Sequence, residues 1–435
     1  MRAAQYIKAW QSNQKIFFIR LSAQKNIKMP GVILMRAAQY IKSMAKQSKN
    51  FLYTAIGAAF GLGGITRFPA LCLEYGGAFI IAYAVVLVFA AVPLLAAELA
   101  LGSRHKGAFP FKSICPLGGA VGALSAINSA AMCACYGVII AIFAVRACTF
   151  HAGVNYGYPA DMPQLSPLIA ALVFIALAFL LTRRAGTRAI VARIAVIFQA
   201  ALLCLLAARG LLYSNAPAVL ASTLGINASS FVSGELWLAA LGQALFSLSL
   251  AAGVMPAFAA EMPRPLSPVR AACIIIGANF CGAVLSAVAT LTLAGGGGCL
   301  ESLDGGALSN ALVLYPAALS AAFSNAHICG IFGCVFYCSL TLTAFVSALS
   351  LARPAYVWVC TARVSPRTAS FAVCAAMLAF CLPFAFGLSF SAVDRLCCNV
   401  LAPLAAAGEA ACFAFHALTK RARGGKIDVW KILDI

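Results

Sequence analysis

The stretch GAAFGLGGITRFP, residues 57–69, places four glycines and an arginine inside an otherwise apolar run. Arg67 would cost roughly 2.5–3.5 kcal/mol at the centre of a membrane span, so it is expected to face water or a carboxylate. A second irregular stretch, FSLSLAAG at residues 246–253, interrupts another apolar run. Backbone that leaves the helix at such points offers N–H groups to an anion and carbonyls to a cation. The competing interpretation is close helix packing, for which glycine is also suited.

The composition places the chain in a lipid bilayer. Of its 435 residues, 63% are hydrophobic and 10% are charged, too few polar residues to cover a water-facing surface. Apolar runs of about 20 residues, each long enough to cross the hydrocarbon core, recur along the chain. The ten predicted spans lie near residues 51–73, 77–101, 117–148, 165–182, 187–213, 235–260, 268–296, 327–352, 369–390 and 396–418. The sequence therefore predicts an all-α, multi-pass membrane protein.

The charges indicate its orientation. The first fifty residues carry Lys and Arg but no acid, and later basic residues cluster in every second loop. The positive-inside rule then predicts that both termini are cytoplasmic and that the protein lies in the plasma or inner membrane. The net charge of +20 is not interleaved with aromatic residues in one patch, so no nucleic-acid partner is expected. The oligomeric state is left open.

Residues that could do bond-making chemistry are not grouped in the sequence. Most of the 18 cysteines stand singly inside spans, where free cysteine is usually small apolar filler, and the four histidines are scattered. We expect no resident metal cluster and no enzymatic activity. The octapeptide MRAAQYIK occurs at residues 1–8 and again at 35–42, and Met35 is the expected working start.

The two interrupted runs fall in spans one and six, which are corresponding members of two groups of five. An odd number of spans per group gives the groups opposite topology, and matching broken helices in inverted repeats indicate a binding site at mid-membrane. We predict ten transmembrane helices in a 5+5 inverted repeat with discontinuous helices 1 and 6. The repeats are expected at 51–214 and 235–418, after a basic segment at 1–50 and before a basic tail at 419–435.

Several stretches match one known family. They are GAAFGLGGITRFP, LEYGGAFIIAY (73–83), VPLLAAELALGSR (92–104), LWLAALGQALFSLSL (236–250), LVLYPAALS (312–320) and VDRLCCNVLAPL (393–404). Together they resemble the neurotransmitter:sodium symporter family, which has the bacterial leucine-transporter fold. The resemblance runs from about residue 51 to residue 418.

The resemblance implies an amino acid held between the two breaks. Its carboxylate would meet the N–H groups of Leu62 and Gly63 and the Tyr136 hydroxyl, with Ser247 nearby. Its ammonium would meet the carbonyls of Ala59 and Phe246 and the Ser249 side chain. Monoamine carriers of the family have an aspartate where this chain has Gly61, so a substrate with its own carboxylate is favoured. The side-chain pocket would be formed by Met132, Ala252, Leu342 and Val346.

That pocket is apolar and expected to be roomy, which favours a medium-to-large neutral amino acid such as leucine, methionine or an aromatic one. The competing interpretation of Met132, Leu342 and Val346 is ordinary core packing.

The resemblance also implies sodium. One site would consist of the Ala59 carbonyl, Ser247, Asn279 and the substrate carboxylate; the other, of the Gly57, Phe60 and Cys338 carbonyls and the Thr341 hydroxyl. Gly64 and Leu342 each stand where a family member supplies another oxygen, so one sodium ion is expected rather than two. Proton coupling is the alternative. Chloride is not expected, because Ala283 lacks the hydroxyl that chloride-dependent members use, although Tyr83, Gln243 and Ser247 match that site.

The family's gates are partly present. Arg67 and Asp394 match the outer gate, and Tyr136 and Phe246 would form the lid over the substrate. At the inner gate Lys42 falls at the basic position, but Ala45 and Tyr356 replace the usual tryptophan and acid. Glu98 and Glu409 are expected to hold loose N–H groups at the sixth-span break, with a proton-carrying role as the alternative.

The predicted function is sodium-coupled uptake of a neutral amino acid by alternating access. The alternatives are proton-coupled or sodium-independent transport, a non-transporting amino-acid sensor or membrane partner subunit, and a channel.

Overall fold

A computed structural model describes residues 31–105, 109–150, 166–263, 266–302, 310–361, 364–385, 392–393 and 396–422. The chain divides into two units, Met1–Gln47 and Ser48–Ile435, and each is described by itself. The described part of the smaller unit is the beginning of helix α3 (Gly31–Ala59), where Lys42 and Lys46 are exposed. The described residues of both units contain no β-strand, as the prediction of an all-α protein requires.

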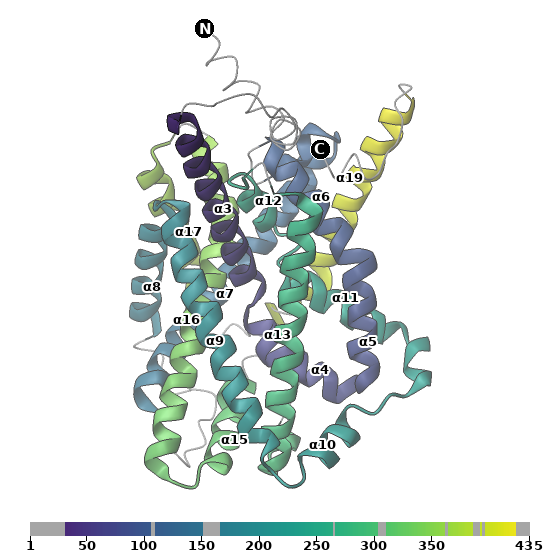
Figure 1. Ribbon diagram of the computed structural model, residues 1–435, viewed down its shortest axis with the longest axis vertical. Coiled ribbons are helices and arrows are strands. Elements are labelled where there is room, and N and C mark those ends of the chain that lie inside the picture. The colour runs from purple at the N-terminus through teal and green to yellow at the C-terminus, as the bar shows by residue number, and fades with distance from the viewer. Residues whose placement is uncertain are drawn as a thin grey trace. The chain divides into compact units, whose positions relative to one another are not determined.

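The first five predicted spans are all present as helices (Figure 1). The first consists of α3, a π-helical turn η1 (Gly63–Arg67) and α4 (Phe68–Tyr75). The second joins α5 (Gly77–Val86), the π-helical η2 (Leu87–Ala91) and α6 (Val92–His105). After the short η3 (Pro110–Ser113) come α7 (Gly118–Thr149), α8 (Ser166–Leu181) and α9 (Ala185–Leu211). The π-helical turn in the second span lies directly before Pro93, whose ring nitrogen cannot donate a helix hydrogen bond.

The second five spans follow after α10 (Ala216–Thr223) and η4 (Ala228–Val232). The sixth is divided into α11 (Gly234–Ser247) and α12 (Val254–Ala259), and the seventh is α13 (Pro268–Gly296). An outer connection contains η5 (Leu300–Ser302), η6 (Asn310–Leu314) and α15 (Tyr315–Ala322). The last three are α16 (Ala326–Thr361), α17 (Pro366–Ala385) and η7 (Cys397–Leu401) with α19 (Ala402–Ala422).

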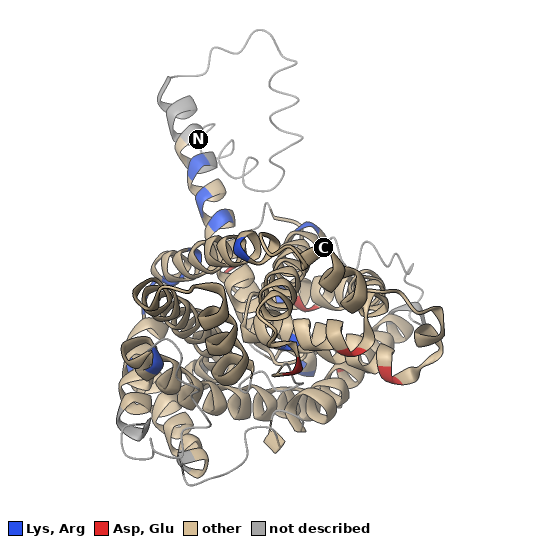
Figure 2. Cartoon of the chain, turned by 90° about the horizontal axis from the view of Figure 1, so that it is seen from below, with Lys and Arg blue, Asp and Glu red and all other residues tan. Residues whose placement is uncertain are grey.

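Length and apolarity support membrane spans among the described helices. Six helices are long and apolar enough to cross a bilayer, and the pair Lys42–Ala59 and Gly63–Tyr75, bent by 49°, passes the same test when it is counted as one span. The fourth and ninth are shorter apolar helices, and the sixth is interrupted. Most of the ribbon is neither acidic nor basic (Figure 2). Large apolar side chains such as Phe89, 78% exposed, and Phe371, 68% exposed, lie on the outside, as lipid-facing residues do.

Packing between the halves follows the predicted inverted repeat. Helices in corresponding places pack against each other: α6 with α13, α7 with α16, and α8 with α17. Two further contacts correspond between the halves. Helix α4 of the first span packs on α13 of the seventh, and α12 of the sixth span packs on α6 of the second. This pattern is the one that a pseudo-two-fold axis in the membrane plane produces, and it brings the broken helices 1 and 6 to the same depth.

Candidate functional site

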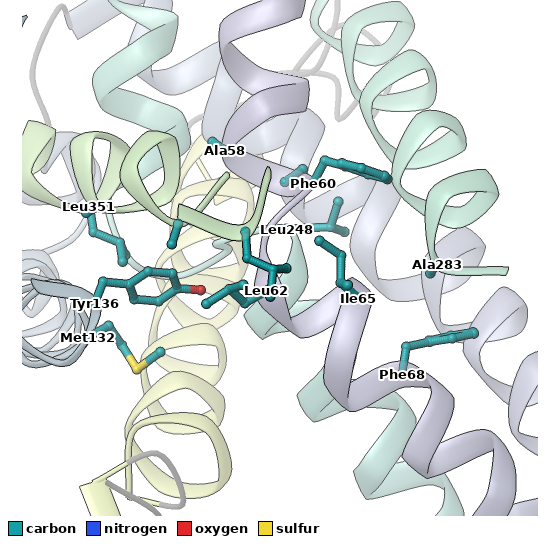
Figure 3. Packing of buried hydrophobic residues seen from close by; sticks show 14 of the residues in the cluster. Ala58, Phe60, Leu62, Ile65, Phe68, Met132, Tyr136, Leu248, Ala283 and Leu351 are labelled. Carbon is teal, nitrogen blue, oxygen red and sulfur yellow. The ribbon is translucent and has the colours of Figure 1, made fainter. Parts of the chain in front are cut away.

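The break in the first span lies at Phe60 and Gly61, between α3 and η1. The side chains on its two sides point in different directions: Phe60 points toward α13, and Leu62 toward Tyr136 (Figure 3). A Cβ on Gly282 would lie 1.7 Å from the Phe60 ring, so that glycine makes room for it. A helix that begins at Gly63 leaves the N–H groups of its first residues without intrahelical partners. The break therefore presents backbone donors next to Tyr136.

Side chains of other helices satisfy the carbonyls of the π-helical turn. Gln243 donates to the Gly63 carbonyl at 3.0 Å, and Asn310 donates to the Thr66 carbonyl at 3.0 Å. The Ile65 carbonyl accepts two hydrogen bonds, from Ser286 at 2.8 Å and Tyr315 at 2.9 Å. Irregular backbone is tolerated at membrane depth only where protein or water satisfies it, and here α11, α13, η6 and α15 do so.

The break in the sixth span covers Leu248–Gly253 and contains left-handed backbone. The φ angles are +51° at Ser249, +55° at Ala251 and +69° at Gly253. For the first two residues this conformation costs of order 1–3 kcal/mol each, a strain that is found mainly at functional sites. Glu98 accepts a hydrogen bond from the Ala251 N–H at 2.8 Å. The expected holding role of Glu98 at this break is thereby confirmed.

A small cavity of about 30 Å³ lies between the two breaks. Its wall contains most of the predicted substrate residues: Gly61, Gly63, Met132, Tyr136, Phe246, Ser247, Ser249 and Ala252. The Phe246 ring rests on Gly63, where a Cβ would lie 2.2 Å from ring carbon Cε1. The expected roominess is wrong for this conformation, since the cavity holds little more than one water molecule. The cavity is small because the Phe246 ring rests on Gly63, and the composition of the sequence does not reveal this contact.

Four predicted substrate residues lie outside the cavity wall. Ala59 and Leu62 belong to the backbone at the break, and their side chains are buried in the main core. Leu342 and Val346 instead pack with Ala192 and Ala195 of α9 in a separate apolar cluster. The residues of α16 that line the cavity are Ser347 and Leu351, one helical turn apart (Figure 3 shows Leu351). The structure therefore presents another face of α16 to the cavity, and the sequence does not orient this helix because its apolar residues favour no single face.

Two polar residues of the wall were missed by sequence reasoning. The Ser347 hydroxyl oxygen is buried, has no hydrogen-bond partner among the described residues, and lies 3.0 Å from where a Cβ on Gly61 would be. The Oδ1 atom of Asn128, on α7, is likewise buried without a described partner. The available signal for Asn128 was its position four residues before Met132 and eight before Tyr136, on the same helix face.

Three residues of the first predicted sodium site and the chloride-like site form one hydrogen-bonded triangle. Asn279 donates through Nδ2 to the Tyr83 hydroxyl at 2.8 Å and to the Ser247 hydroxyl at 3.2 Å. The two hydroxyls are 3.0 Å apart, and Ala283 is buried beside them on α13. The Tyr83 and Ser247 hydroxyl oxygens thus lie together beside the cavity, and the atom of Asn279 that faces them is its Nδ2 donor.

The second predicted sodium site is not brought together as expected. Gly57 meets α16 at Val346, where the distance from a Cβ to the Cγ1 atom would be 3.1 Å. Thr341 is five residues earlier, about 7.5 Å along the helix, and its hydroxyl donates to the Tyr337 carbonyl at 2.7 Å. Cys338 is exposed. The α16 hydroxyl at the first-span break is that of Ser347, and the Phe60 carbonyl remains at the break.

The outer gate can be described on one side only, because Asp394 lies outside the described residues. Arg67 donates to Asn399 of η7 at 3.4 Å, and its guanidinium carbon lies 5.9 Å from the centre of the Phe246 ring. Arg67 therefore lies over the aromatic lid and joins it to the tenth span.

An ion cluster at the other end of the spans was not predicted. Glu261, two residues after the end of α12, forms salt bridges with Arg188 of α9 and Arg353 of α16. Arg188 reaches both carboxylate oxygens at 2.6 Å, and the Arg353 guanidinium lies 5.3 Å from the Tyr356 ring centre. The sequence feature that could have indicated this cluster is Glu261 itself, a single acidic residue in a loop region that is otherwise basic. This cluster, named the Glu261 cluster below, ties the sixth span to the fifth and eighth.

A second carboxyl group lies next to Glu98. Glu98 and its neighbour Glu409 are both fully buried. Ser125 of α7 donates to Glu409 at 3.4 Å. Glu98 thus joins the second span to the break of the sixth, and Glu409 joins the tenth span to the third.

These features define a class: a multi-pass membrane protein with a small cavity between two discontinuous helices of an inverted repeat. The family model described as "Sodium:neurotransmitter symporter family" matches residues 43–152. MhsT, solved in complex with L-phenylalanine, superimposes with a TM-score of 0.73 at 21% identity, over 88% of this chain and 93% of MhsT. The predicted resemblance to the neurotransmitter:sodium symporter family, with its ten-helix core fold, is confirmed.

Relatives with transporter names match parts of the chain. The sodium-dependent neutral amino acid transporter B(0)AT3 of Mus musculus is 47% identical over 76 residues, 17% of this chain and 12% of that protein. An uncharacterised sodium-dependent transporter of Methanocaldococcus jannaschii is 26% identical over 335 residues, 69% of this chain and 66% of that protein. These names describe transporters, in agreement with the prediction that the chain is not an enzyme.

Proposed function

We propose that the protein is a secondary active transporter that takes up a neutral amino acid together with sodium by alternating access. The observation that carries the proposal is the small cavity between two broken helices, with Phe246 and Tyr136 in its wall and the Glu261 cluster at the other end of the spans. The names of two relatives, both described as sodium-dependent transporters, also support this proposal.

In this proposal the zwitterionic part of the amino acid lies at the breaks. N–H groups at Leu62 and Gly63 and the Tyr136 hydroxyl hold the carboxylate, since the start of a helix favours negative charge. The carbonyls of Ala59 and Phe246 and the Ser249 hydroxyl receive the ammonium. Gly61 leaves no carboxylate of the protein in this place, so the substrate supplies its own. Because the cavity is small, its walls must separate for a medium-to-large side chain to fit.

Sodium is proposed beside the substrate, as one ion rather than two. Hydroxyl oxygens at the cavity are offered by Ser247 and Ser347, Asn279 contacts Ser247 at 3.2 Å, and hard cations prefer several oxygen ligands. The first-span carbonyls that sequence reasoning assigned to sodium, those of Gly57 and Phe60, lie at or next to the same break. Chloride is not part of the proposal.

The proposed orientation places both termini and the Glu261 cluster in the cytoplasm of a cell with the protein in its plasma or inner membrane. Closure on the outside then involves Arg67, Phe246 and Tyr136, and closure on the inside involves Glu261 with its two arginines. Alternating access requires that only one of these closures opens at a time.

The test is uptake of radiolabelled amino acids into proteoliposomes containing the full chain. Accumulation of a neutral amino acid that requires an inward sodium gradient, at each of two pH values, is the expected result. Accumulation driven by a pH gradient without sodium would replace sodium by protons. Saturable binding without accumulation would identify a sensor or partner subunit, and current that does not saturate with substrate would identify a channel.

Removing the unpartnered hydroxyl of the α16 face is expected to weaken sodium dependence. In Ser347→Ala the sodium concentration for half-maximal uptake is expected to rise roughly tenfold, since a charge-assisted contact is lost. Ser350→Ala is the matched control, because the Ser350 hydroxyl already donates to the Val346 carbonyl at 2.8 Å within its own helix. A sodium titration that is the same in both variants and the wild type would remove Ser347 from the ion site.

Restoring an amide at Gly64 is expected to strengthen sodium binding. A Cβ at this buried position would meet no atom within 4 Å, so the structure has space for a side chain there. In Gly64→Asn the half-saturating sodium concentration is expected to fall roughly threefold or more, since each added oxygen ligand favours a hard cation. Gly64→Ala adds the Cβ without the oxygen and is expected to leave sodium affinity unchanged. Equal behaviour of the two variants would contradict the assignment.

A further inference from the structure

We propose that Asn128 reads the far end of the substrate side chain, so that the protein selects a long neutral amino acid ending in an O–H or N–H donor. Tyrosine and tryptophan are the amino acids that combine an apolar body with such an end. This inference rests on the proposed function and narrows its substrate class, which the sequence predicts only as medium-to-large and apolar.

The position of Asn128 fits a reader of the side-chain end. Asn128, Met132 and Tyr136 follow one another at intervals of four residues on α7, and all three line the cavity. The eight residues from Tyr136 to Asn128 span about 12 Å along the helix. The Tyr136 hydroxyl lies 3.7 Å from where a Cβ on Gly61 would be, which places it at the first-span break. Asn128 is therefore at the end of this wall that is distant from the proposed carboxylate position.

The bonding state of Asn128 calls for a ligand. Its side chain is 4% exposed, and its Oδ1 atom has no hydrogen-bond partner among the described residues. The next residue behaves differently, since Ser129 is equally buried but donates to the Leu351 carbonyl at 2.7 Å. Leaving a buried carbonyl oxygen unpaired costs free energy, and a donor supplied by the substrate removes this cost.

The rest of the wall determines what kind of side chain can reach that oxygen. Met132, Leu351, Cys398 and Ala402 are further residues of the cavity wall, and none of them is charged. A side chain that is polar along its length or charged would lose its hydration there without compensation. A side chain that has an apolar body and one hydrogen-bond donor at its end matches both the uncharged wall and the Asn128 oxygen.

The experiment uses two nearly isosteric pairs of amino acids. Binding of tyrosine and phenylalanine, and of glutamine and methionine, is measured on the purified full chain at one saturating sodium concentration. A site that hydrogen-bonds a substrate donor discriminates against the analogue that lacks it. We expect the wild type to bind tyrosine roughly 10- to 100-fold more tightly than phenylalanine, and glutamine more tightly than methionine.

The variant Asn128→Leu keeps the volume but removes the oxygen, and the preference is expected to vanish or reverse while phenylalanine and methionine still bind. Retained binding of these two also shows that the variant is folded. Should it fail to fold, Asn128→Thr keeps an acceptor, and it is expected to retain a preference for tyrosine. Asn215→Leu makes the same substitution at an exposed position outside the cavity and is expected to match the wild type.

The outcomes separate this inference from the proposed function. If all four amino acids bind but the wild type does not favour tyrosine and glutamine, the role of Asn128 is overturned and the transporter proposal stands. The same holds if Asn128→Leu retains the wild-type preference, because another group would then read the donor. If none of the tested amino acids binds, the proposed function fails, and with it the inference.

Discussion

Replacing Gly63 with alanine is expected to weaken amino-acid binding about 5- to 150-fold. The added Cβ would lie 2.2 Å from Cε1 and 2.4 Å from Cδ1 of the Phe246 ring, so the ring must leave its place over the cavity. Inserting a methyl group into a packed site costs about 1–3 kcal/mol, and here the displaced group is the lid itself. Binding of a radiolabelled neutral amino acid to the purified protein measures the loss.

The neighbouring glycine supplies the control for this prediction. Gly64→Ala adds the same methyl group to the same helical turn, but its Cβ meets nothing within 4 Å. Alanine is also the better helix former by about 1 kcal/mol, so this variant is expected to be as stable as the wild type or more so, with unchanged affinity. If both alanine variants bind equally well, the contact of Phe246 with Gly63 does not limit ligand binding.

Replacing Glu261 with glutamine is expected to open the inner side. The change leaves Arg188 and Arg353, with side chains 5% and 8% exposed, facing each other without a carboxylate. Removing one partner of a buried ion pair costs roughly 3–5 kcal/mol, and a value at or below the lower end is expected because the Glu261 side chain is 35% exposed. A cysteine-accessibility assay from the inner side should show increased labelling, and sodium-driven accumulation should fall at least tenfold.

A double-mutant cycle distinguishes this cluster from general destabilisation. Arg353→Gln in the Glu261→Gln background is expected to cost less than the sum of the single changes, because the repulsion between arginines is relieved. Glu301→Gln removes an exposed acid from η5 and is expected to change neither readout. Additive losses, or inner labelling that stays at the wild-type level, would show that the Glu261 cluster does not hold the inner side closed.

The first break could be predicted because its residues conflict with a plain membrane helix. Arg67 and four glycines within thirteen residues have no place in lipid, and the structure places the break at Phe60 and Gly61. The sixth break was visible through its position in the repeat. Its geometry was not, because nothing in the type of Ser249 or Ala251 requires the left-handed backbone that both adopt.

The contribution of α16 shows where sequence reasoning stops. A helix whose apolar residues favour no single face has no periodicity to orient it, so the sequence predicts Leu342 and Val346 where the structure presents Ser347 and Leu351. The Glu261 cluster joins residues that are 73 and 92 positions apart, and no local pattern links them. Such long-range partners depend on how the spans pack, which the sequence of each span alone does not specify.

The small volume of the cavity also affects the kinetics of ligand binding. A chamber with room for about 30 Å³ admits no amino acid until the surrounding helices separate, so the encounter itself cannot be the slow step at high ligand concentration. The observed rate of binding should then reach a plateau at high ligand concentration, and the value of this plateau is the first-order rate at which the protein opens. The measured affinity would also depend on the fraction of molecules that are open at equilibrium. A substitution remote from the ligand could therefore change the affinity by changing that fraction alone.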